Sequence, residues 1–190
     1  MKKMRKLLLL CLAAVAVMMI AGCEGQNKKN NLGHGDSLLL DSMAEQDSSL
    51  YGRCGEDCAM NTLQLISDKG DTIYLGYDPD AEVSPVRGGI AVGDRVAVML
   101  GKDAYGQTIA ASVINLTTLL GKWQSIDRNF EIKEGGVVET VVNEQKPYTS
   151  WKIVNGKLVL STDTFHIYEL GADSLYLENK IGIFAYKRVK

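Results

Sequence analysis

The thiol of Cys23 stands in the most distinctive setting of any reactive side chain in this sequence. It follows a start with four basic residues, an apolar run over residues 7–20 and the small residues Ala21 and Gly22, and it precedes a polar, asparagine-rich stretch. A membrane-spanning helix needs roughly 20 apolar residues, whereas this run has about 14 before a small-residue site, which is typical of an export signal. Residues 1–22 are therefore predicted to be a signal peptide.

The tetrapeptide Ile20-Ala21-Gly22-Cys23 resembles the lipobox of bacterial lipoproteins. This resemblance implies cleavage before Cys23, attachment of diacylglycerol to its thiol, and membrane anchoring by several acyl chains such as palmitate. The alternative is an ordinary secretory signal, which leaves Cys23 as a free thiol. In enteric lipoproteins an aspartate after the cysteine retains the protein at the inner membrane, so Glu24 implies the outer membrane of the cell envelope, on its periplasmic side. Residues 23–49 are polar and read as a lipidated, flexible tether.

A second pair of thiols, Cys54 and Cys58, remains once Cys11 is removed with the signal and Cys23 is acylated. The intervening residues 55–57 allow the chain to turn, and in an oxidising compartment the favoured interpretation is a disulfide between the two. Two reduced structural thiols are the alternative. A metal site would need two further ligands, and the two histidines of the chain lie far away in sequence, so no metal or other cofactor is predicted.

Ser37, Asp163 and His166 have the side-chain types of a catalytic triad. Gly35-Asp36-Ser37-Leu38 resembles the nucleophile block of GDSL-type esterases, and residues 163–166 resemble the D-x-x-H that completes it. The context argues against this, because such a serine follows a buried strand of a helix-covered parallel sheet, whereas Ser37 follows a polar run. An esterase is kept only as a remote alternative; the chain is interpreted as not an enzyme, with no catalytic residue.

The net charge of the chain without the predicted signal peptide limits which partners it is expected to bind. The predicted signal carries four of the 21 Lys and Arg residues and none of the 23 acids, which leaves a net charge near −6. Nucleic acids and anionic membrane surfaces attract clustered basic residues, so neither is expected as a main partner.

Two all-β units are expected after the tether, each built of antiparallel strands. Residues 50–117 show short runs of period-two alternation separated by glycine-rich turns. The segment GGIAVGDRVAVML within them resembles the strand pair of small OB-type barrels. This unit has nine acidic residues and scattered tyrosines, so it is interpreted as an OB-like small barrel with no assigned ligand.

Residues 121–190 read as an antiparallel meander of seven or eight strands, with the hairpin turn Asn155-Gly156 as its clearest signal. They resemble the lipocalin-like domains of bacterial lipoproteins, in which Gly-x-Trp, here Gly121 to Trp123, opens the first strand and a basic residue, here Arg188, lies over the tryptophan. This implies an up-and-down β-barrel closed at one end by that pair. The family's usual chain is about twice as long, so a shallow interior is expected.

Alternation assigns a set of side chains to the interior of this barrel: Trp123, Phe130, Ile132, Val138, Val142, Trp151, Ile153, Leu158, Leu160, Phe165, Ile167, Leu175, Leu177 and Ile183. These can fill it alone, or leave a cleft for a small apolar ligand, with Trp123, Trp151, Phe165, Leu177 and Arg188 as the candidate contacts. Two functions stay open: a lipid-anchored protein that binds a small apolar ligand, and a structural module that binds another envelope protein.

Overall fold

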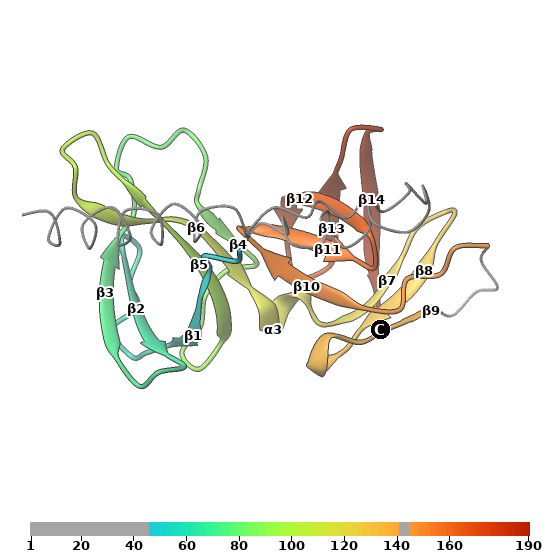
Figure 1. The fold of residues 1–190 in the computed structure, drawn as a ribbon, viewed down its shortest axis with the longest axis horizontal. Helices are drawn as coiled ribbons and strands as arrows, with labels where there is room; N and C mark the ends of the chain where they lie inside the picture. The colour runs from blue at the N-terminus through green and yellow to red at the C-terminus, as the bar shows by residue number, and fades with distance from the viewer. Residues whose placement is uncertain (1–45, 141–144) are drawn as a thin grey trace, which may run out of the picture. The chain divides into compact units, whose positions relative to one another are not determined.

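Strands dominate the fold, as the alternating pattern predicts. The computed structural model describes residues 46–140 and 145–190, and these form two mainly antiparallel sheets, drawn in blue to green and in yellow to red in Figure 1. The predicted signal peptide, Cys23 and Ser37 lie outside the described residues. In the part of the chain that is described, no helix is long and apolar enough to cross a membrane.

The first sheet is small and has six strands. Its strands are β1 (Leu50–Cys54), β2 (Thr62–Ser67), β3 (Thr72–Gly76), β4 (Val86–Arg87), β5 (Arg95–Lys102) and β6 (Thr108–Asn115), in the order β3-β2-β1-β5-β6-β4. A parallel contact between β3 and β6 closes the five long strands into a ring. Alternate residues point inward, and Leu63, Leu65, Val96 and Val98 form its core together with Cys54. The prediction of a separate small β-unit is confirmed, and its likeness to OB barrels stays a prediction.

The second sheet is a nearly closed barrel of eight antiparallel strands. After the short helix α3 (Leu116–Leu119), its strands are β7 (Gly121–Gln124), β8 (Asn129–Ile132), β9 (Val138–Thr140), β10 (Trp151–Val154), β11 (Lys157–Leu160), β12 (Asp163–Leu170), β13 (Ser174–Glu178) and β14 (Ile183–Val189). The order β10-β11-β12-β13-β14-β7-β8-β9 is an up-and-down meander in which the last strand pairs with the first. A bridge between Val137 and Ser150 brings the β9 and β10 edges together. The predicted meander is confirmed.

Local residues account for the turns of this barrel. Asn155 and Gly156 both have positive φ angles, 48° and 72°, between β10 and β11. Two consecutive residues with positive φ are what a tight type I′ hairpin requires, and asparagine and glycine are the residues that adopt them most readily.

The interior agrees with the alternation except near the start of β14. Thirteen of the predicted interior residues are described; eleven are buried, Trp151 is half-buried, and Ile183 is 56% exposed. Ile183 pairs across the sheet with Glu178 and shares its outward face, so the prediction for Ile183 is wrong. Phe184 and Tyr186 point inward in its place, because successive side chains of a strand alternate between the two faces.

The two sheets pack against each other within one compact unit. Ala97 and Ile114 of the first sheet and Leu116 and Leu119 of α3 belong to the same buried cluster as the barrel core. Backbone contacts add to this, since the amide of Gly88 donates to the carbonyl of Leu170 at 2.9 Å.

Asp47, in the segment assigned to the tether, also contacts both sheets. Its carboxylate accepts hydrogen bonds from the amide of Asn155 and the hydroxyl of Tyr51, at 3.0 and 2.7 Å. Burial alone would raise the pKa of Asp47, but these bonds and those from Ser49 lower it to about 2. The side chain is therefore held as an anion near the start of the described residues.

Candidate binding sites on the C-terminal barrel

One end of the barrel is closed by Trp123 and Arg188, as the resemblance implies. The two residues pair across β7 and β14, and the guanidinium carbon of Arg188 lies 4.2 Å from the centre of the fully buried indole ring. The indole N–H donates to the carbonyl of Leu119 at 2.9 Å. Gly121 has φ of 129°, and a Cβ there would lie 2.4 Å from Arg188, which explains physically why the motif begins with glycine.

Arg188 does more than cover the tryptophan. Its guanidinium donates to the carbonyls of Thr118, Leu120 and Ala172, so that it joins α3, the start of β7 and the turn before β13. Partial burial lowers the pKa of Arg188 from its usual range, and the nearby Asp173 opposes this shift. The sequence motif did not indicate these three acceptors. This end of the barrel is thus a structural closure whose donors are already used.

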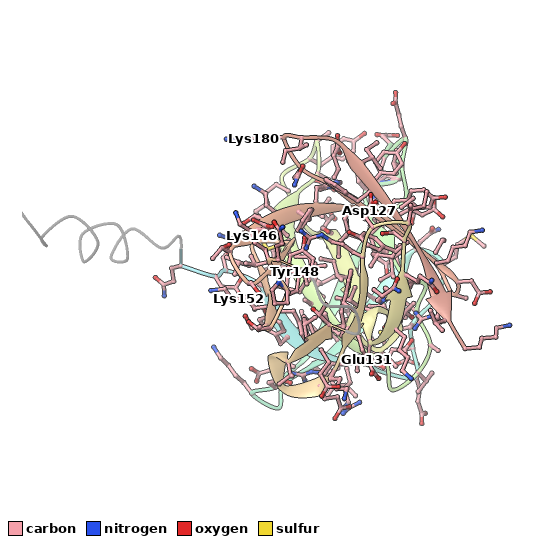
Figure 2. The ribbon with its side chains drawn as sticks, turned by 90° about the vertical axis from the view of Figure 1, so that its right-hand side faces the viewer. Asp127, Glu131, Lys146, Tyr148, Lys152 and Lys180 are labelled. Carbon is pink, nitrogen blue, oxygen red and sulfur yellow. The ribbon has the colours of Figure 1, made fainter. Side chains whose placement is uncertain are left out.

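The other candidate ligand contacts are mostly core residues. Phe165 and Leu177 are buried among the side chains that fill the interior. Aromatic rings pack edge to face along it, from Tyr186 to Phe130 and from Tyr148 to Phe165. Figure 2 shows Tyr148 within the outline of the barrel. A ligand inside would have to displace these side chains, and their role as ligand contacts stays a prediction.

Trp151 differs, because it is half-buried and lines a hollow of about 600 Å³ beside the first sheet. Its indole N–H donates to the carbonyl of Lys133 at 2.6 Å. The two arginines of this hollow already have partners: Arg95 pairs with Asp68, and Arg53 donates to the carbonyl of Gly93. The hollow therefore offers apolar surface to a ligand, but both of its arginines are already bound to other groups of the protein.

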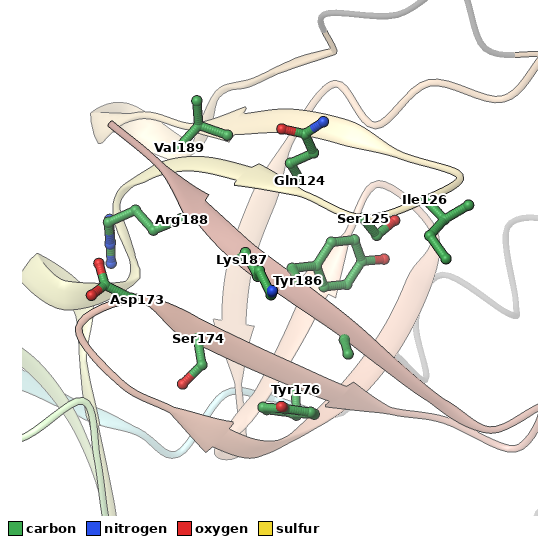
Figure 3. Close-up of a pocket in the computed structure, with 11 residues that line it drawn as sticks. Gln124, Ser125, Ile126, Asp173, Ser174, Tyr176, Tyr186, Lys187, Arg188 and Val189 are labelled. Atoms are coloured by element: carbon green, nitrogen blue, oxygen red, sulfur yellow. The ribbon is translucent and has the colours of Figure 1, made fainter.

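A larger groove lies on the outside of the barrel, across β7, β13 and β14 (Figure 3). It has a volume of about 810 Å³, within the range of small-molecule sites, and apolar atoms form most of its lining. Eleven residues line it: Gln124, Ser125, Ile126, Asp173, Ser174, Tyr176, Ala185, Tyr186, Lys187, Arg188 and Val189. Sequence reasoning missed all of them except Arg188, because only the strand register shows that residues 124–126 lie next to residues 174–176 and 185–189.

Cys54 and Cys58 are close neighbours but are free thiols in this structure, Cys54 buried and Cys58 half-buried. The Cys58 thiol donates to the carbonyl of Gln64 at 3.5 Å. The pKa of the Cys54 thiol is raised to about 12, mainly because the thiol is buried and secondly because Cys58 lies close to it. The structure contains no disulfide between them, so the predicted bridge stays a prediction.

Because its pKa is raised, the thiol of Cys54 should react with alkylating reagents more slowly than the thiol of Cys58. Burial and the raised pKa keep the Cys54 thiol un-ionised at pH 8, and the thiolate is the reactive form. In the reduced protein, iodoacetamide should therefore modify Cys58 much faster than Cys54, as followed by peptide mass spectrometry. If the bridge forms after export, neither residue should be modified before reductant is added. Equal labelling rates of the two thiols would contradict the assignment of Cys54 as the buried partner.

Asp163 and His166, the two described residues of the esterase pattern, do not form a catalytic pair in this structure. Asp163 and His166 are exposed residues of β12, and His166 faces Glu178 of β13, with Nδ1 and Oε2 3.9 Å apart. Ser37 lies outside the described residues. Within residues 46–140 and 145–190, no cluster of three or more metal-ligating side chains is found.

Comparison with known families agrees with this geometry. A family model described as lipocalin-like matches residues 115–189, which span α3 and the whole eight-stranded barrel. Comparisons with curated proteins and with solved structures gave no match. The C-terminal domain is therefore lipocalin-like, a class of barrel that generally binds rather than catalyses.

Proposed function

We propose that this protein is a lipid-anchored binding protein of the bacterial cell envelope, which holds a small apolar ligand in the open groove of its lipocalin-like domain. One contrast carries the proposal. The barrel interior is occupied by its own buried side chains, whereas the outer face has an apolar-lined groove of about 810 Å³. A small molecule therefore finds accessible apolar surface outside the barrel without displacing the core.

The anchoring part of the proposal rests on the sequence. The lipobox resemblance at Cys23 supports lipidation, and Glu24 supports the outer membrane facing the periplasm. The net negative charge of the mature chain supports a partner other than nucleic acid. We propose no catalytic step and no cofactor.

A second candidate, the binding of an envelope protein, is favoured by a separate observation. Ile126, Ile181 and Ile183 are large apolar residues with exposed fractions of 101%, 86% and 56%. They belong to the β7–β8 turn, the β13–β14 turn and the first residue of β14. Exposed apolar groups of this kind are typical of surfaces that contact another macromolecule.

The two candidates are separated by analysing the protein purified from its own host. Native mass spectrometry of the detergent-released, lipidated protein should show one retained small molecule, which organic extraction removes and identifies. Protein that was denatured, extracted and refolded provides the unliganded control. The ligand-binding proposal would be contradicted if native and refolded protein had the same mass and the native sample carried a stoichiometric protein partner instead.

A further inference from the structure

The strand register fixes which side chains lie side by side in the outer groove. On its floor, the small Ala185 of β14 pairs with Tyr176 of β13. Side chains paired across strands lie on the same face about 5 Å apart, so the Tyr176 ring stands beside the Ala185 methyl group. Ile126, in the turn that follows β7, also lines the groove. The small alanine thus leaves a shallow apolar channel beside Tyr176, with Ile126 at its rim.

Two residues further along β14, on the same face, Lys187 places a cation at one end of this channel. Lys187 pairs with Ser174 of β13 and with Gln124 of β7, so an ammonium group stands between a hydroxyl and an amide (Figure 3). Within the part of the chain that the structure describes, the Lys187 side chain makes no ion pair or hydrogen bond. It is exposed and unpartnered, in contrast to the two arginines of the hollow beside Trp151.

The remaining charges of the groove leave it positive. Asp173 is its one acid, and Figure 3 shows this carboxylate beside Arg188, which interacts with it electrostatically. The Arg188 guanidinium is engaged with three carbonyls and with Trp123. Asp173 is therefore balanced by Arg188, and the charge of Lys187 is not compensated within the groove.

We propose that this groove binds an amphipathic molecule with a single anionic head group. The head group contacts the ammonium of Lys187, with Ser174 and Gln124 as neutral hydrogen-bonding partners, and the apolar chain lies over Ala185 beside Tyr176, toward Ile126 at the rim of the groove. This rests on the proposed function and adds to it the chemical class and the orientation of the ligand. The charge of the ligand is inferred from Lys187, since a neutral molecule would leave that cation unused.

Three probes with the same ten-carbon chain test the class: decanoate, decanol and decylammonium. Each is titrated into the mature chain carrying Cys23→Ser, labelled with ¹⁵N, and followed through amide chemical shifts. Decanoate should bind more tightly than decanol, and decylammonium should bind most weakly. The amides of Ser174, Ala185 and Lys187 should shift, while that of the interior Leu177 should not. Octanoate should bind more weakly than decanoate by up to about fifteenfold, since a buried methylene contributes about a fourfold gain in affinity.

Matched variants test the site. Lys187→Glu should weaken decanoate by about tenfold or more and make decylammonium the preferred probe, because like charges repel and opposite charges attract. Lys187→Gln should weaken decanoate by about threefold, the contribution of one exposed ion pair. Ala185→Phe fills the channel and should weaken all three probes. Lys152→Glu makes the same charge change at an exposed residue of β10, which lies at the edge of the view in Figure 2, and should bind like wild type.

The proposal is overturned if decanoate does not bind, or if Lys187→Glu and Ala185→Phe bind it as wild type does. Shifts confined to interior amides would likewise overturn it and place the ligand inside the barrel. These results can be told apart from failure of the proposed function. If host-purified protein retains a small molecule but Lys187→Glu leaves decanoate binding unchanged, ligand binding stands and the assigned groove is wrong.

Discussion

Replacing Trp123 by alanine should lower the free energy of unfolding by about 3–5 kcal/mol, the range for truncating a large buried aromatic side chain. The ring is fully buried beneath Arg188, and its N–H satisfies the carbonyl of Leu119. Truncation removes the apolar burial, the cation–π contact and this hydrogen bond together. Since whole domains have only about 5–15 kcal/mol of stability, this one change removes a large part of it.

The measurement is urea unfolding followed by circular dichroism, on the mature chain carrying Cys23→Ser so that no detergent is needed. The whole mature chain is used because the core of the barrel includes Ala97 and Ile114 of the first sheet. Arg188→Ala should cost about 2–3 kcal/mol, since it removes a cation–π contact and leaves three carbonyls to find other partners. Lys187→Ala, one residue away on the outward face, serves as the control and should change stability by less than about 0.5 kcal/mol.

An unfolding midpoint for Trp123→Ala equal to that of wild type would contradict the role of this residue as the floor of the barrel. An equal cost for Lys187→Ala would contradict the alternation of faces along β14. The ordering is the sharper result, because it compares neighbouring residues of one strand in one protein.

Replacing Cys23 by serine should move the protein from the membrane fraction to the soluble envelope fraction. The lipobox resemblance makes this thiol the point of acylation, and a serine hydroxyl at that position provides no thioether linkage. Loss of the acyl chains removes about 0.8 kcal/mol per buried methylene, which is enough to abolish stable anchoring. Fractionation by ultracentrifugation, with incorporation of an alkyne-labelled palmitate, measures both steps.

Cys54→Ser is the matched control for this experiment. It makes the same chemical change at a residue buried in the first sheet, and the protein should remain membrane-bound and labelled. Retention of Cys23→Ser in the membrane fraction would contradict lipid anchoring through this residue. Loss of label from both variants would indicate that acylation requires correct folding rather than Cys23.

Much of the fold could be predicted from local patterns. Period-two alternation located the strands of both sheets, and the positive φ angles required at Asn155 and Gly156 located a hairpin. The Gly-x-Trp motif and Arg188 were placed together because residues of a barrel's first and last strands are neighbours. The alternation alone does not say which of the two faces of a strand points inward: Ile183 of β14 was assigned to the interior, whereas Phe184 and Tyr186 point inward.

The candidate groove could not be predicted in this way. Residues such as Tyr176, Ala185 and Lys187 are ordinary outward-facing residues when each strand is considered alone. They form a groove only because of the residues that lie opposite them on the neighbouring strands. That register is set by the packing of the inward faces. The same holds for Asp47, whose neighbour Asn155 is more than a hundred residues away in sequence.

By itself, the sequence predicted an export signal with acylation at Cys23, and it determined the two all-β units and the side chains of most of the core, because these depend on composition and on the two-residue period of a strand. The tertiary structure decided that the interior is filled, that Arg188 is engaged with three carbonyls, and that Lys187 stands unpartnered in an open groove. These features depend on contacts between residues distant in the chain. Such contacts exist only when the strands are paired in one register, since a shift by a single residue would exchange the inner and outer faces of the barrel.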